Sequence, residues 1–199
     1  MISAVILAAG ESQRMRNKNK LLLPIKGEAL IRRFVKAVCL SEVEDVFIVL
    51  GYEANKIKDV LIDQPVDFVY NKFYMRGMLT SIKAGIRASS KKCDGFMICL
   101  SDLPFAKIRD FNILLRAYAR FRVKECALII VPVFQGKRGN PVLFSNEFKE
   151  EILEHEGEGC RGLIAKHNNN VKEVNMKNDN LLCDIDTPED YRKICFIEN

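Results

Sequence analysis

The sequence has no tryptophan, only two histidines and no pair of cysteines separated by two residues. It contains seven cysteines, and an odd number without paired spacing argues against both a disulfide framework and a zinc site. Most of them lie within apolar runs, where a reduced thiol packs as a small hydrophobic group. The histidines lie in polar stretches, so we do not expect them to be catalytic. These features predict a protein with reduced thiols, and hence a cytoplasmic one.

Long hydrophobic runs are also absent. No stretch approaches the ~20 consecutive apolar residues that span a bilayer. The apolar start of the chain, residues 1–10, is too short for a signal peptide and has no basic residues before it. We therefore expect no membrane partner, and we interpret this segment as a buried strand that begins the fold.

Positive charge is concentrated in one segment, although the formal net charge is only +5. Between residues 11 and 26 a single anion, Glu11, accompanies the cations Arg14, Arg16, Lys18, Lys20 and Lys26. Such a cluster suits either nucleic acid or a polyphosphate. No aromatic residue lies among these cations and all of them fall in one loop, which favours a polyphosphate over nucleic acid.

Strand-like and helix-like segments alternate along the chain. The expected strands are 3–7, 45–50, 68–70, 96–100, 127–133, 140–144, 171–175 and 181–185, and the expected helices are 28–40, 54–63, 79–89, 109–122, 146–154, 161–166 and a last one that opens at Pro188. This alternation predicts an α/β fold in three layers, with a mostly parallel, mixed and doubly wound sheet between helices. The length of 199 residues fits a single domain, 1–199.

Ligands of such sheets bind beyond the carboxyl ends of the strands, which here selects the loops 8–24, 101–107 and 183–188. In the first loop, the small residues Ala8, Ala9 and Gly10 would let backbone amides approach phosphate oxygens. Arg14 and Lys20 would add positive charge. The alternative is a solvated basic connector. Rival phosphate motifs fail, because no Walker sequence is present and the GxGxxG match at 157–162 follows a helix.

Aspartates stand in the other two loops. Asp102 follows the apolar strand 96–100 and precedes Leu103-Pro104, so it is either a Mg²⁺ ligand or a residue that initiates a turn. Asp186 precedes Thr187-Pro188, where an acidic residue also starts helices well. Asp184 would point to the same side as Asp186 if the segment is extended.

Several segments in order resemble a known family. The string LAAGESQRM…KLLLP is followed by RGMLTSIKAGI at 76–86, CLSDLP at 99–104, GKRGNPVLFS at 136–145, GCR at 159–161 and DIDTPEDY at 184–191. Together they are similar to the MobA-like nucleotidyltransferases, a superfamily that includes the molybdenum cofactor cytidylyl- and guanylyltransferases. The cytidylyltransferase branch is closest, because Ala9 stands where guanylyltransferases carry glycine and its methyl group would crowd a purine. Arg16 and Gly157 depart from the family pattern, which has glycine and aspartate there.

The resemblance implies a Rossmann-like nucleotide-diphospho-sugar transferase fold and a Mg²⁺-dependent enzyme. It would transfer CMP from CTP to the terminal phosphate of molybdopterin and release pyrophosphate. The implied nucleotide-binding residues are Leu7, Ala8, Ala9, Gly10, Glu11, Ser12, Arg14, Lys20, Gly77, Ser81 and Asp102, of which Arg14, Lys20 and Asp102 would be catalytic. Asp102 and Asp186 would hold the metal, with Asp184 a weaker candidate, and Arg138 and Arg161 would hold the acceptor phosphate.

An acceptor phosphate is already an anionic nucleophile, so the reaction needs positioning and charge neutralisation more than a general base. Two alternatives remain open. The first is a cytidylyl- or guanylyltransferase with another acceptor, such as a sugar phosphate, methylerythritol phosphate or phospholactate. The second is a nucleotide-sensing domain without turnover.

Overall fold

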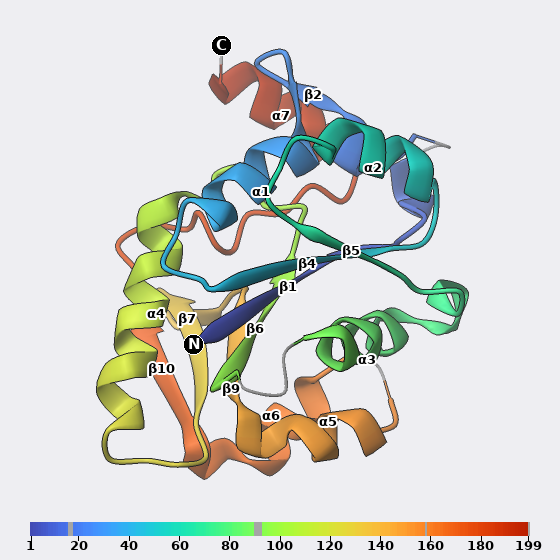
Figure 1. The fold of residues 1–199 in the computed structure, drawn as a ribbon. Helices are drawn as coiled ribbons and strands as arrows, with labels where there is room; N and C mark the ends of the chain where they lie inside the picture. Colours follow the sequence, from blue (N-terminus) through green and yellow to red (C-terminus); the bar gives the residue numbers. More distant parts are fainter. Residues whose placement is uncertain (16–17, 90–92, 158, 199) are drawn as a thin grey trace.

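A computed structural model describes residues 1–15, 18–89, 93–157 and 159–198. In this part of the chain, eight strands form the central sheet, in the order β10-β7-β9-β6-β1-β4-β5 with β8 paired to β7 (Figure 1). The strands are β1 (Ile2–Ala8), β4 (Asp45–Leu50), β5 (Asp67–Tyr70), β6 (Gly95–Leu100), β7 (Ile129–Phe134), β8 (Lys137–Arg138), β9 (Val142–Ser145) and β10 (Val171–Asn175). β9 runs antiparallel to both β6 and β7, whereas β1, β4, β5 and β6 are mutually parallel. The predicted mixed sheet is confirmed.

Helices cover both faces of the sheet (Figure 1). On one side lie α1 (Leu30–Cys39), α2 (Ala54–Leu61), α4 (Ile108–Arg122) and α7 (Pro188–Glu198), and on the other lie α3 (Met78–Ala88), α5 (Lys149–Glu154) and α6 (Arg161–Lys166). A hydrophobic cluster fills the space on each side. The structure therefore has the three layers that the alternating pattern predicts. No helix in the described residues is both long and apolar enough to cross a membrane.

The central strand β1 shows why its sequence is apolar at successive positions. Ala4 and Ile6 belong to the cluster under α1 and α4, whereas Val5 points to the opposite side. There Val5 meets Gly85 of α3, where a methyl group added to the glycine would lie only 2.2 Å from the Val5 Cγ1 atom. Helix α3 packs this closely on the sheet because Gly85 has no side chain.

Several element boundaries differ by a few residues from the prediction, and two differences lie next to the functional loops. The helix expected from residue 28 begins at Leu30, because Pro24–Ile25 (β2) and Glu28–Ala29 (β3) form a small hairpin whose turn places Gly27 at φ 79°. The strand expected over 181–185 is wrong. That segment starts in a turn closed by the Leu182 and Cys183 amides on the Asp179 carbonyl, and it then runs without a ladder partner in the described chain.

The parallel strands end at a common edge, which positions the functional loops. Ala8 at the end of β1 pairs with Leu50 at the end of β4, and Leu7 pairs with Leu100 at the end of β6. The loop after β1 and the loop after β6 therefore begin side by side. The C-terminal segment joins them, because the buried Ile185 donates its amide to the Asp102 carbonyl at 3.0 Å.

Candidate functional site

A cleft of about 410 Å³ opens at this edge of the sheet. Its walls come from the loop after β1, the loop after β6, the start of α3 and the segment before α7. The predicted nucleotide-binding residues that line it are Leu7, Ala9, Gly10, Glu11, Ser12, Arg14, Lys20, Gly77, Ser81 and Asp102. Ala8 instead packs in the hydrophobic cluster beneath α1. Asp186, predicted as a metal ligand, lines the cleft as well.

The loop after β1 is folded back on itself by hydrogen bonds to Ser12. The Ser12 carbonyl accepts a hydrogen bond from the Met15 amide at 2.8 Å, and the Ser12 hydroxyl oxygen accepts one from the Lys20 amide at 3.2 Å. Ser12 itself has a φ of 53°, in the left-handed region. The loop therefore returns Lys20 to the same cleft wall as Gly10. Arg16, whose place in the family pattern belongs to glycine, lies outside the described residues.

Lys20 connects the first loop to the two acidic segments. Its Nζ atom lies 2.6 Å from Asp102 Oδ2 and 2.9 Å from Asp186 Oδ1, with only 16% of the Lys20 side chain exposed. Burial lowers the pKa of Lys20, but the charges and hydrogen bonds of Asp102 and Asp186 outweigh it and leave the pKa raised. The side chain is therefore an ammonium ion. The exposed Arg14 guanidinium adds a second cation, 2.8 Å from Asp186 Oδ2.

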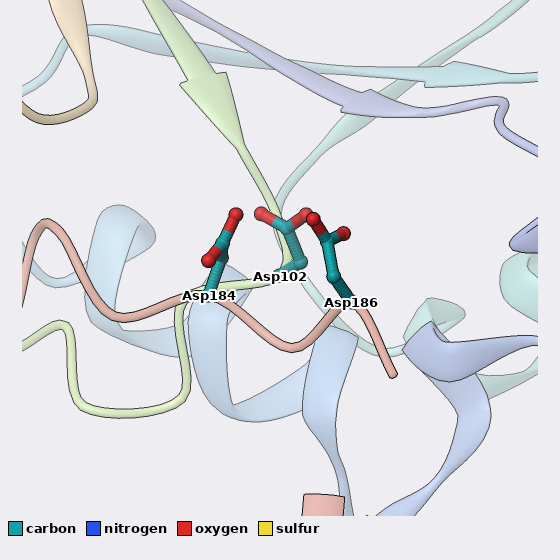
Figure 2. Close-up of side chains that lie close together, drawn as sticks. All are labelled: Asp102, Asp184 and Asp186. Carbon is teal, nitrogen blue, oxygen red and sulfur yellow. The ribbon is translucent and has the colours of Figure 1, made fainter. Parts of the chain in front are cut away.

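Asp102, Asp184 and Asp186 point toward the same space (Figure 2), and one oxygen of each lies within 4.8 Å of the others. Ile185 is buried between Asp184 and Asp186, so the extended segment turns both carboxylates to the same side. Partial burial and the charges of Asp186 and Asp102 raise the pKa of Asp184.

This acidic cluster, defined as Asp102, Asp184 and Asp186, fits a hard divalent cation such as Mg²⁺ or Mn²⁺. Such ions take carboxylate oxygens as ligands. Asp102 Oδ1 is buried and has no hydrogen-bond partner among the described residues, which is costly for a charged oxygen. In addition, three carboxylates face the two cations Lys20 and Arg14, so the formal charge of the group is negative. A bound cation would satisfy both deficits.

Further cleft residues were not predicted from the sequence. Ser101 donates its hydroxyl to the Leu7 carbonyl at 2.6 Å and so fastens the end of β6 to β1. The sequence feature that could have indicated Ser101 is its position as a polar residue directly before Asp102, at the end of a buried strand. Tyr74 lies in the short helix η3 (Tyr74–Arg76) and also lines the cleft. It packs into the space that a side chain at Gly51 would fill, and no pattern in the sequence indicates this contact.

The predicted acceptor residues lie apart from the cleft lining. Arg138 is on β8, where its Nε atom pairs with Glu173 Oε1 of β10 at 2.8 Å. Arg161 is exposed as the first residue of α6. A side chain at the nearby Gly159 would contact Met78 Sδ of the cleft wall at 3.6 Å, so the start of α6 lies close to the cleft mouth.

Known proteins are similar in sequence to this chain over most of its length. The purine catabolism protein PucB of Bacillus subtilis is 29% identical over 198 residues, which cover 94% of this chain and 92% of PucB. The molybdenum cofactor cytidylyltransferase of Escherichia coli is 26% identical over 195 residues, which cover 96% of this chain and 93% of that enzyme.

The fold is also found in a solved structure. Rv0371c from Mycobacterium tuberculosis, solved in complex with manganese, superposes with a TM-score of 0.81 at 19% identity and covers 98% of each chain. Residues 4–171 match the MobA-like NTP transferase domain. The resemblance seen in the motifs is thereby confirmed, and the chain belongs to the MobA-like NTP transferase family.

Proposed function

We propose that this protein is a single-domain, cytoplasmic cytidylyltransferase that moves CMP from CTP to the terminal phosphate of molybdopterin and releases pyrophosphate. The observation that carries the proposal is the position of Lys20, 2.6 Å from Asp102 and 2.9 Å from Asp186. Three segments distant in the sequence thus bring cations and carboxylates to one cleft. A triphosphate and its metal need both kinds of group.

Asp102 and Asp186 are the proposed metal ligands, with Asp184 able to contribute. The orphaned Asp102 Oδ1 atom supports this assignment, and so does the manganese of the structural relative Rv0371c. We propose Mg²⁺ as the working ion; when bound, it would neutralise phosphate charge and help to align the reacting phosphates.

In the proposed reaction an acceptor phosphate oxygen forms a bond to the α-phosphorus of CTP, and the bond from that phosphorus to the pyrophosphate oxygen breaks. Backbone amides around Gly10 would hold the β- and γ-phosphates. Lys20 and Arg14 would donate hydrogen bonds to the leaving pyrophosphate, exchanging their carboxylate partners for phosphate oxygens. Of the two candidate acceptor residues, Arg161 is favoured because α6 begins close to the cleft mouth, whereas Arg138 is paired with Glu173.

The residue at position 9 supports CTP over GTP. A methyl group at Gly51 would lie 2.7 Å from Tyr74 Cβ and 2.8 Å from the Ala9 methyl, so both side chains pack against Gly51. Both line the cleft. The space that glycine would leave at position 9 for a purine is occupied by the Ala9 methyl group.

The test is pyrophosphate release with each nucleoside triphosphate, Mg²⁺ and molybdopterin. We expect CTP to be used at least about tenfold better than GTP, and Ala9→Gly to narrow that preference. A preference for GTP would overturn the nucleotide assignment. Release with a sugar phosphate or methylerythritol phosphate in place of molybdopterin would overturn the acceptor, and tight CTP binding without release from any acceptor would favour a nucleotide sensor.

A further inference from the structure

We propose that Asn71 is a positioning residue that fixes the hydrogen-bond polarity of Ser81, so that the Ser81 hydroxyl presents a hydrogen to the base in the cleft. This inference rests on the proposed function, because it assigns the base to the part of the cleft next to Ser81 and Gly77. It adds a residue outside the cleft lining to the determinants of nucleotide specificity.

Asn71 follows β5 and is held rigidly at its backbone and side chain. Only 4% of it is exposed, and its amide donates to the Leu50 carbonyl at 2.9 Å. Its Oδ1 atom accepts the Phe73 amide at 3.0 Å. Because a backbone N–H can only donate, this contact assigns the oxygen and nitrogen of the Asn71 side chain.

The Nδ2 group of Asn71 must then donate to its other neighbours. It lies 2.8 Å from Thr80 Oγ1 and 3.0 Å from Ser81 Oγ, so its two hydrogens have one hydroxyl oxygen each. Both hydroxyls are therefore acceptors toward Asn71, and each must place its own hydrogen elsewhere.

The two hydroxyls differ in where that hydrogen goes. Thr80 Oγ1 lies 2.9 Å from the Gly77 carbonyl and 3.0 Å from the Phe73 carbonyl, either of which accepts its hydrogen. Ser81 has no acceptor for its hydroxyl within the described residues, although it is 4% exposed and lines the cleft. Its hydrogen is left for a ligand.

A donor fixed in this way matches one kind of base edge. On its Watson–Crick edge cytosine offers the acceptors N3 and O2 beside the donor N4–H₂, whereas guanine offers the donors N1–H and N2–H₂ beside the acceptor O6. We assign Ser81 to the N3 and O2 side of cytosine, where guanine would present donors. A freely rotating serine hydroxyl would serve either, as donor or as acceptor. Asn71 occupies one of the two lone pairs of the Ser81 oxygen, and the Ser81 hydrogen has no acceptor among the described residues. An acceptor edge of the base takes up that hydrogen, whereas a donor edge could use only the second lone pair and would leave the hydrogen unpaired, which is how polar sites reject a wrong ligand.

The substitution Asn71→Asp tests this directly with almost no change in shape. One carboxylate oxygen still accepts the Phe73 amide, but the other now accepts hydrogens from Thr80 and Ser81. The Ser81 oxygen then presents lone pairs to the base. We expect the preference for CTP, measured by calorimetry as the ratio of the GTP and CTP dissociation constants, to fall about tenfold in this variant. That is the effect of one hydrogen bond. The KM for CTP should rise while kcat stays within about twofold of wild type.

Controls separate this mechanism from charge and from folding. A purely electrostatic effect of the new carboxylate would weaken CTP and GTP alike, and Asn55→Asp on the exposed side of α2 gives the matched change of charge. Because Asn71 acts through Ser81, the double variant with Ser81→Ala should bind CTP like Ser81→Ala alone. The inference would be overturned if the losses of CTP affinity in the two single variants multiplied in the double variant. It would also be overturned if the ratio of the CTP and GTP dissociation constants were unchanged in Asn71→Asp.

Three further results keep the test decisive. Ser81→Ala by itself should weaken CTP binding about tenfold, and an unchanged affinity would overturn the inference even if Asn71→Asp does not fold. A wild-type protein that prefers GTP would instead refute the proposed function. A wild-type preference for CTP that survives in Asn71→Asp refutes the role of Asn71 alone.

Discussion

At the scale of single residues, the candidate site is organised around one buried ammonium group. Lys20 contacts Asp102 and Asp186 at once, and its side chain and that of Asp102 are mostly buried. The two carboxylates keep the Lys20 ammonium group at the edge of the cleft, where it can exchange them for other anions. In our account those anions are the phosphates of CTP.

Asp102→Asn tests the acidic side of this arrangement. The amide keeps the shape of the carboxylate but loses its charge, so both the metal and Lys20 lose a partner. We expect kcat/KM to fall by roughly 10²- to 10³-fold while the melting temperature stays close to that of wild type. Asp67→Asn, at the exposed start of β5, is the matched control. Near-normal turnover in Asp102→Asn would show that the metal ligand is wrongly assigned.

Lys20→Ala tests the basic side. Loss of a charged donor to the triphosphate should lower kcat/KM for CTP by about 10- to 100-fold. Lys18→Ala removes an exposed cation from the same loop, outside the cleft lining, and should leave kcat/KM unchanged. Equal losses in the two variants would mean that the loop acts through its overall charge and that Lys20 has no specific contact with CTP.

At the scale of elements, much of the architecture could be predicted because strand and helix periods differ. The buried strands, most helices and the mixed sheet follow from apolar runs and their spacing. The segment 181–185 was mistaken for a strand because its sequence, Leu-Leu-Cys-Asp-Ile, is a short and mostly apolar run. In the structure this segment is held by the hydrogen bond from the Ile185 amide to the Asp102 carbonyl. That contact joins segments far apart in the sequence, so a local pattern does not reveal it.

The packing of α3 on β1 gives a prediction at this scale. Gly85→Ala would place a methyl group 2.2 Å from Val5 Cγ1, so the helix must shift away from the sheet. We expect the free energy of unfolding in urea to fall by about 1–3 kcal/mol. Gly162→Ala, at an exposed position of α6, should change the free energy of unfolding by less than about 1 kcal/mol. A stability loss no larger at Gly85 than at Gly162 would contradict the close packing described here.

At the scale of the whole molecule, the rule that ligands bind beyond the carboxyl ends of parallel strands pointed to the three loops that meet at the cleft. It could not supply Asn71 or Tyr74, whose roles depend on neighbours brought close by the fold. Nor could it position Arg138 and Arg161, because arginines look alike in sequence whether they face solvent, an ion pair or a ligand. Shared motifs suggested those two residues, and the fold keeps both out of the cleft lining.

Thiol chemistry tests the arrangement of the whole chain. All seven cysteines are free, Cys126 is exposed and Cys93 and Cys99 are buried. Burial raises the pKa of Cys160 to about 12, so its reactive thiolate is scarce at pH 8. We expect brief iodoacetamide treatment of the native protein at pH 8, followed by mass spectrometry, to modify Cys126 first. Rapid modification of Cys99 or Cys160 in the folded protein would contradict the packing.

The central claim is that the loop after β1, the loop after β6 and the segment before α7 form one centre for a metal and a polyphosphate. A crystal structure of the protein with CTP and Mg²⁺ tests it most directly. The account predicts a cation bound by Asp102 and Asp186, with the triphosphate between Gly10 and Lys20. A nucleotide bound elsewhere, or a metal held without Asp102 and Asp186, would contradict it.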